Sequence, residues 1–287
     1  MDERTARRLW HLVEPVHSVT YFTEESRAAA DAAGMRGFWM GYFGMRSAPL
    51  GAVGPAVVTS CYYVFHRDRV ARALPDAWSH AGPERLLAAR LAGAGAALRR
   101  LCGDALIDSP DTALAADLAW QAAAAADTRG RVLGAANQAL DRPDEPHLAL
   151  WQAATTLREH RGDGHVAALV SHGIGPVQAQ LLKVAAGESD GELLRTGRQW
   201  DDEAWQAATE DLRAQGWLDG DGHLTAAGRA AHEEVERLTD AAALSPWRAL
   251  GERDTERLAG LLAPLARAAS GVIPPGNPVG LTATAGR

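Results

Sequence analysis

The densest group of chemically capable side chains lies between Leu157 and His165. These nine residues include two arginines, two histidines, a glutamate, an aspartate and two glycines. Arg158 and Arg161 are three residues apart and share a helix face. The glycines predict a sharp turn, so that one helix ends and another begins near His165. The free amides at that helix start, together with both guanidiniums, would hold a phosphate, a sulfate or a carboxylate.

The same run permits other interpretations. Asp163 is equally suited to cap the second helix, and the arginines could tie neighbouring helices together. His160 and His165 have side-chain pKa values suited to proton transfer, so both are candidate catalytic residues. They are five residues apart across the predicted break, whereas a spacing of four places two imidazoles on one helical face. We therefore predict no metal site.

A second candidate group is aromatic and lies near the N-terminus. His17 and Tyr21 are four residues apart, and Trp39, Tyr42 and Arg46 recur at helical spacing. A pocket lined by these groups would suit a mostly apolar ligand with an acidic group, and His17 is its candidate catalytic residue. The alternative is that the aromatic stripe is simply core. The candidate ligand contacts are Tyr21, Trp39, Tyr42, Arg46, Arg158, Arg161 and Asp163.

The chain carries no motif that identifies a cofactor. We find no glycine-rich dinucleotide motif after a strand, no phosphate-binding Gly-Lys-Ser/Thr, no Cys-x-x-Cys pair and no serine in a nucleophile elbow. We expect no cofactor, and the sequence leaves open whether the protein is an enzyme.

These residues must be positioned by helices, because apolar side chains recur at helical spacing along most of the chain. Glycine and proline separate the segments. We expect a mainly α protein whose residues 1–172 form a helical bundle with a ligand pocket. Within it, the pattern predicts one helix over residues 148–160 and another over 165–172.

Residues 173–270 have a different pattern. Helices are expected at 177–186, 201–215 and 226–240, with a Gly/Ser/Asp linker after the first. An Asp-Gly turn between apolar residues at 217–225 predicts a two-stranded wing. This order resembles the MarR-type winged-helix proteins. Residues 271–287 are expected to be a flexible tail.

The charge of this winged-helix-like region disfavours DNA binding. Residues 191–240 contain twelve acidic residues and five arginines, and the candidate recognition helix at 201–215 has five carboxylates and one arginine. A DNA-reading helix needs Lys and Arg for the phosphate backbone. DNA contact would require a homodimer that presents Arg195 and Arg198, or the N-terminal arginines.

Over most of its length, the chain resembles an actinobacterial family of helix-turn-helix-like proteins. The strings that carry the resemblance are Glu14-Pro15-Val16-His17 through Tyr21-Phe22, Gly37 through Phe43, Arg46 through Gly51, and Leu157 through His165. The resemblance implies the architecture; it assigns no residue roles and no reaction.

Composition narrows the class of protein further. The formal charge is -7, which disfavours non-specific binding to nucleic acid or an anionic membrane. The two cysteines have no paired spacing, and no stretch approaches a membrane span or a signal peptide, so we expect a cytoplasmic protein. Three hypotheses remain: a small-molecule-binding protein or enzyme acting on an anionic or aromatic metabolite, a ligand-responsive regulator, and a protein-protein interaction module.

Overall fold

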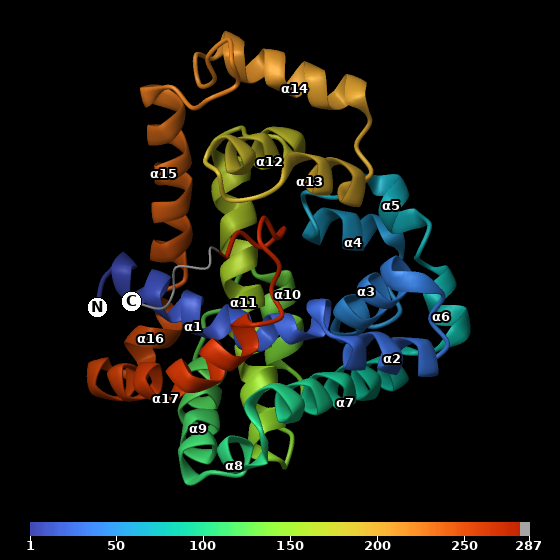
Figure 1. The fold of residues 1–287 in the computed structure, drawn as a ribbon, viewed down its shortest axis with the longest axis vertical. Helices are drawn as coiled ribbons and strands as arrows, with labels where there is room; N and C mark the ends of the chain where they lie inside the picture. Colours follow the sequence, from blue (N-terminus) through green and yellow to red (C-terminus); the bar gives the residue numbers. More distant parts are fainter. Residues whose placement is uncertain (282–287) are drawn as a thin grey trace.

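The computed structural model describes residues 1–281, and its secondary structure is helical (Figure 1). The helices, in chain order, are α1 (Glu3–Phe22), α2 (Glu24–Ala32), α3 (Gly37–Ser47), η1 (Ala48–Leu50), α4 (Pro55–Cys61), α5 (Arg67–Ala71), α6 (Asp76–His80), α7 (Pro83–Cys102), α8 (Asp104–Ile107), α9 (Pro110–Ala124), α10 (Val132–Gln138), α11 (Pro146–Ser171), α12 (Pro176–Ala185), α13 (Gly191–Arg198), α14 (Asp202–Ala214), α15 (Ala226–Ala242), α16 (Ser245–Leu250) and α17 (Glu252–Ser270). The expectation of a mainly α fold is confirmed.

Helix α11 is the centre of the molecule and packs against α1, α7, α9, α10 and α15. Trp151 of α11 is 1% exposed and shares a core with Leu9 of α1, Leu98 of α7 and Leu262 of α17. Burial of such side chains stabilises the fold by about 1.5–3 kcal/mol each. The bundle core therefore joins residues from both ends of the chain.

Two further cores lie beside the bundle core. One is formed by α2 to α7 around Phe43 and Leu74. The other contains Leu169 at the end of α11, Leu212 of α14 and Val235 of α15. Helix α11 thus runs from the bundle core into the C-terminal core. Helices α16 and α17, which the sequence placed in the second domain, pack on the bundle against α9 and α1.

The expected two-stranded wing is wrong for the described residues. They contain one isolated antiparallel bridge, between Leu218 and Leu224, and no strand. The second arm is too short for a ladder, because Thr225 is already the N-cap of α15 and its side chain accepts from the Gly228 amide. The connection between α14 and α15 is a loop over residues 215–225 (Figure 1).

Two segments around α12 differ from the sequence-based expectation. The presumed linker before α14 contains α13, which is capped by the Asp190 side chain. Residues 271–281 pack against this region: Asn277 is fully buried, and its carbonyl accepts from the Ser189 hydroxyl at 2.9 Å. Residues 282–287 of the expected tail lie outside the described part. Among residues 1–281, no helix combines the length and the apolar character needed to cross a membrane.

Candidate functional site

Helix α11 passes through Leu157–His165 without a break. The glycines at positions 162 and 164 have ordinary helical backbone and not the left-handed conformation common just after helix ends. The predicted helix start near His165 is therefore wrong. So is the anion site at that start, because the amides of a helix interior are already hydrogen-bonded. Asp163 is likewise no helix cap.

The glycines allow close approach instead of a turn. A Cβ atom at Gly164 would collide with the guanidinium of Arg131. Arg131 uses this space to donate to the carbonyl oxygens of His160 at 2.6 Å and Ala242 at 2.9 Å, which links α11 to the end of α15. Gly162 lines a cavity, where its missing side chain leaves room. Tertiary packing thus overrides the local tendency of glycine to end a helix.

The continuous helix sorts the predicted residues onto two faces. Arg158, Arg161 and His165 follow three- and four-residue spacing and line the larger of two cavities. His160 and Asp163 lie on the other side, toward α10 and the loop that precedes it, and line neither cavity. His160 and Asp163 therefore do not lie beside the other candidate site residues, which line the cavities.

The residues on the second face are held by backbone groups. His160 Nε2 lies 3.0 Å from the carbonyl oxygen of Asp127, and burial lowers the pKa of His160 to about 4. Asp163 Oδ2 accepts from the Gly134 amide at 2.8 Å, and burial raises the pKa of Asp163 to about 6. Both side chains link α11 to its neighbours.

On the cavity face, a four-residue charge cluster joins α1, α3 and α11. Arg46 donates two hydrogen bonds to Glu159, from Nε to Oε1 at 2.7 Å and from Nη2 to Oε2 at 2.9 Å. Arg158 donates to Glu159 at 2.9 Å and to Glu14 at 3.3 Å. Burial alone would raise the pKa of Glu159, but the two guanidiniums outweigh it and hold the pKa well below its usual range. Two arginines balance two glutamates.

His17 belongs to a hydrogen-bonded line beside this cluster. The Thr155 hydroxyl donates to the Trp151 carbonyl oxygen, so it accepts from His17 Nδ1 at 2.9 Å. His17 Nε2 then accepts from the Tyr21 hydroxyl at 3.0 Å. Burial lowers the pKa of His17 to about 3, so the imidazole is neutral at pH 7. This geometry makes His17 a fixed acceptor that orients Tyr21.

Arg161 and His165 lie in a second balanced cluster, between α11, α15 and α1. Arg161 Nη2 pairs with Asp240 at 2.9 Å and Glu236 at 3.3 Å, and Arg7 pairs with the same two carboxylates. His165 Nδ1 lies 2.9 Å from the Thr239 hydroxyl. The predicted ligand contact Arg161 and the candidate catalytic residue His165 border the larger cavity. Arg161 Nη2 and His165 Nδ1 already have protein partners, whereas Arg161 Nε has none within the described residues.

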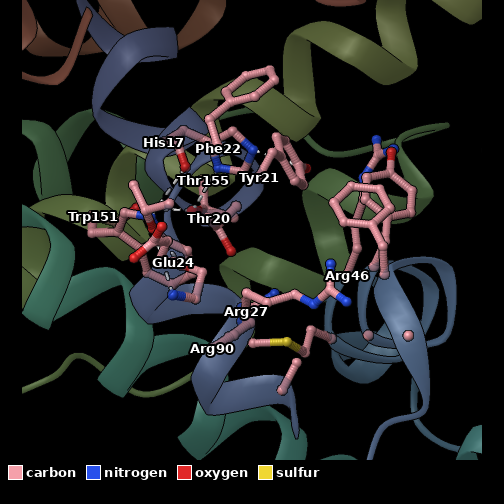
Figure 2. Close-up of a pocket in the computed structure, with 18 of the residues that line it drawn as sticks. His17, Thr20, Tyr21, Phe22, Glu24, Arg27, Arg46, Arg90, Trp151 and Thr155 are labelled. Carbon is pink, nitrogen blue, oxygen red and sulfur yellow. Dashed lines mark hydrogen bonds between the residues drawn. The ribbon is translucent and has the colours of Figure 1, made fainter. Parts of the chain in front are cut away.

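Two cavities of about 650 Å³ and 290 Å³ meet at a shared wall. The wall contains Tyr21, Tyr42, Arg46 and Glu159, and the Arg46 Nη1 donates to the Tyr42 hydroxyl at 2.7 Å. In Figure 2, His17, Tyr21 and Thr155 gather on one side of the smaller cavity, across from Arg46. The predicted contact Trp39 lines the larger cavity.

Arg198, at the end of α13, is a cavity residue that the sequence reasoning placed only in a DNA-binding context. Its guanidinium carbon lies 3.9 Å from the centre of the Phe65 ring. Within residues 1–281 this guanidinium has no hydrogen-bond or ion-pair partner, and its Nε is buried. Burial lowers the pKa of Arg198 to about 10, so it stays charged at pH 7. No local sequence signal reveals this, because α13 itself was not predicted.

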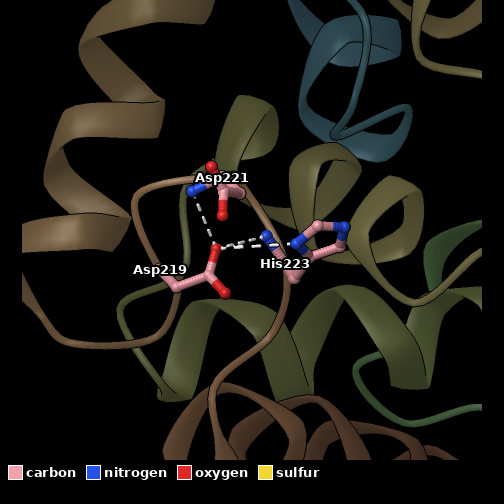
Figure 3. A group of neighbouring side chains, drawn as sticks. All are labelled: Asp219, Asp221 and His223. Carbon is pink, nitrogen blue, oxygen red and sulfur yellow. Dashed lines mark hydrogen bonds and ion pairs between the residues drawn. The ribbon is translucent and has the colours of Figure 1, made fainter.

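The turn between α14 and α15 brings three possible metal ligands together: Asp219, Asp221 and His223 (Figure 3). One ligand atom from each lies within 4.8 Å of the others, and all three residues are exposed. Asp219 Oδ1 accepts from the backbone amides of Asp221 at 3.0 Å and His223 at 2.9 Å. The carboxylate thus closes the turn, which accounts for the arrangement without an ion.

Comparison with known proteins identifies a family. A model of the Helix-turn-helix family matches residues 6–274, which is nearly the whole chain. The chain therefore belongs to that family. No curated protein and no solved structure matches it.

Proposed function

We propose that this helix-turn-helix family member binds a small aromatic carboxylate in its larger cavity. The volume of about 650 Å³ falls within the range of small-molecule sites. Trp39, Tyr42 and Phe65 form an aromatic wall, with ring centres 5.6–5.7 Å apart for the pairs that include Phe65. Such a wall suits the flat, apolar body of an aromatic ligand.

The single observation that carries the proposal is the unpaired Arg198. The other arginines of the cavity, such as Arg46 and Arg161, already pair with carboxylates of the protein. Arg198 is partly buried, and its enclosed Nε lacks a partner. A cation withdrawn from water without a counter-ion is costly, and a ligand carboxylate would supply one. The planar guanidinium also suits a carboxylate, which it binds with two parallel hydrogen bonds. A ligand so held would place its ring beside Phe65.

The experiment compares carboxylates with their neutral amides. Phenylacetate and indole-3-acetate are titrated into the full chain by calorimetry, with phenylacetamide and indole-3-acetamide as controls. We expect the acids to bind at least tenfold more tightly than the amides and to raise the melting temperature. The Arg198→Met variant should bind the acids about tenfold or more weakly, since a charged hydrogen bond is lost.

A matched control lies one turn earlier on α13. Arg195 pairs with Glu192 at 2.9 Å, also binds Asp202, and lines neither cavity. The Arg195→Met variant should bind the acids like the unmodified chain. Equal affinity for acids and amides, or equal weakening by both substitutions, would refute the proposal.

A second candidate function is that of a ligand-responsive regulator. Its support is that α13 precedes α14 in the helix-turn-helix region and also carries Arg198 into the cavity, so an occupied site would contact that region directly. On α14, Asp202, Glu203, Glu210 and Asp211 are exposed, which disfavours DNA as its partner. An electrophoretic shift titration at low salt tests this, and salt-sensitive binding to a defined DNA site would contradict the expectation.

A further inference from the structure

Arg90 of α7 is a second buried cation to which the protein gives no counter-ion. The residue is 4% exposed. Its Nη2 donates to Asn137 Oδ1 at 3.0 Å and Gln152 Oε1 at 2.9 Å. Both partners are neutral amides, and no carboxylate of residues 1–281 forms an ion pair with it. Arg46, by contrast, forms an ion pair with Glu159 through two hydrogen bonds.

The two amides cannot turn away from Arg90. Gln152 Nε2 donates to the Asn137 carbonyl oxygen at 3.3 Å, and Asn137 Nδ2 donates to the Leu133 carbonyl oxygen at 2.9 Å. Their side-chain oxygens are therefore fixed toward the guanidinium. The two amide oxygens accept hydrogen bonds from Nη2 of Arg90 only, and because they are neutral they do not compensate its charge. Burial lowers the pKa of Arg90 to about 10, so Arg90 remains a cation at pH 7.

The rest of the guanidinium reaches the smaller cavity. Nε and Nη1 of Arg90 make no hydrogen bond within the described residues, yet neither is a fully enclosed polar atom. Arg90 is among the residues that line the smaller cavity and not the larger one, so Nε and Nη1 are the groups that it can offer to a ligand there (Figure 2). The Trp151 ring lies beside it, 5.4 Å from the guanidinium carbon.

The other charges around this cavity are accounted for. Glu159 is neutralised by Arg46 and Arg158. Glu24 and Arg27, from α2, are exposed to solvent. One positive charge, that of Arg90, therefore remains uncompensated in the buried part of the cavity. The remaining walls include Tyr21, Phe22, Phe38 and Trp151.

We propose that the smaller cavity is a second, separate binding site, for a small monocarboxylate with an apolar body. The carboxylate would accept hydrogen bonds from Nε and Nη1 of Arg90, and the body would lie against the aromatic walls. A monoanion matches the single uncompensated charge. The cavity volume of about 290 Å³, against about 650 Å³ for the larger one, selects a smaller molecule.

The test uses butyrate and benzoate, with butyramide and benzamide as neutral controls. Binding to the full chain is measured by ligand-observed NMR and calorimetry. We expect both acids to bind, and the amides to bind at least tenfold more weakly. Inorganic phosphate, which at neutral pH is a mixture of monoanion and dianion and has no apolar body, should also bind at least tenfold more weakly.

Substitutions locate the site. Arg90→Met should weaken binding of butyrate at least tenfold, and Arg90→Lys, which keeps the charge, should restore part of it. Arg99→Met is the matched control on the same helix, because Arg99 pairs with Asp104 and Asp108 on the surface and should leave binding unchanged. Arg198→Met tests whether the two cavities bind independently, since it should weaken the binding of indole-3-acetate and leave the binding of butyrate unchanged.

Three results would overturn the proposal. One is that neither acid binds the unmodified chain. Another is that Arg90→Met and Arg99→Met bind butyrate equally well. The third is that phosphate binds more tightly than either acid. If the unmodified chain binds butyrate but not indole-3-acetate, the proposal for the larger cavity is contradicted and that for the smaller cavity is not.

Discussion

The buried and partly buried arginines that border the two cavities include two classes. Arg46 and Arg158 bind glutamates within the protein and join α1, α3 and α11. Arg90 and Arg198 have no carboxylate partner in residues 1–281. The first class holds the fold together. The second leaves charge uncompensated, and each member borders a different cavity.

The comparison shows where to look for function in a helical protein without a recognisable motif. A buried charge that is paired within the protein has a structural role, because the ion pair holds two helices together. An unpaired one destabilises the folded chain unless something outside the chain completes it. The arginines without a carboxylate partner are therefore the candidates for ligand binding.

The largest expected effect comes from breaking the paired class. Glu159→Gln leaves Arg46 and Arg158 buried with a single glutamate between them. We expect the free energy of unfolding to fall by about 3–5 kcal/mol, measured by urea denaturation. Glu234→Gln is the control, because Glu234 forms an exposed i,i+3 pair with Arg237 and should change stability by less than about 1 kcal/mol. Similar losses of stability in the Glu159→Gln and Glu234→Gln variants would contradict the claim that the Glu159 cluster holds the fold together.

The pH dependence of stability is the next effect. Burial lowers the pKa of His17 to about 3 and of His160 to about 4, so the unfolded chain binds more protons than the folded one below pH 6.5. Their contribution to stability is complete above pH 6.5 and is lost as the pH falls toward these values. Each such proton costs about 1.4 kcal/mol per pH unit. His165, whose pKa burial lowers to about 4, acts in the same direction, whereas Asp163, with a pKa raised to about 6, opposes one of these histidines below pH 6.

The measurement is the melting temperature between pH 7 and pH 4. We expect a fall, with a shallower slope in the His160→Gln variant, whose amide can still donate to the Asp127 carbonyl. An Asp163→Asn variant should show a steeper fall, since the opposing group is removed. A flat profile in the unmodified chain would show that the histidines are charged in the folded state.

The two glycines of α11 test the difference between its cavity face, which carries Gly162, and its packed face, which carries Gly164. Gly162→Ala adds a methyl group that meets only ordinary contacts on the cavity face, and should raise stability by about 0.5–1 kcal/mol. Gly164→Ala displaces the Arg131 guanidinium on the packed face, and should lower stability. Urea denaturation measures both. The same sign for the two variants would contradict the assigned faces.

The smallest effect is expected for the unpaired class. Arg198→Met removes a partly buried charge that has no protein partner, so stability without ligand should change by less than about 1 kcal/mol or increase. Arg90→Met also removes an unpaired charge, but it leaves the buried Asn137 and Gln152 oxygens without their donor, which costs about 1–3 kcal/mol and offsets that gain. Ligand binding should fall in the same variants. A loss of more than about 2 kcal/mol in the Arg198→Met variant would show that Arg198 is a structural residue.

The sequence by itself determined the helical class and several residues of the wall between the cavities. The four-residue spacings of His17 with Tyr21 and of Tyr42 with Arg46 correctly predicted neighbouring side chains, because helix geometry is local. The acidic character of α14 was also legible from residue types alone. The assignment of the candidate residues to ligand binding stays a prediction.

Tertiary structure decided the rest. Whether Gly164 ended a helix depended on Arg131 and α15, which pack against it from distant parts of the chain. Whether an arginine was paired depended on contacts such as Arg46 with Glu159, 113 residues apart. Ionic partners separated in this way leave no periodic signal in one sequence. For that reason only the folded chain could distinguish the arginines that hold it together from the two that face its cavities unpaired.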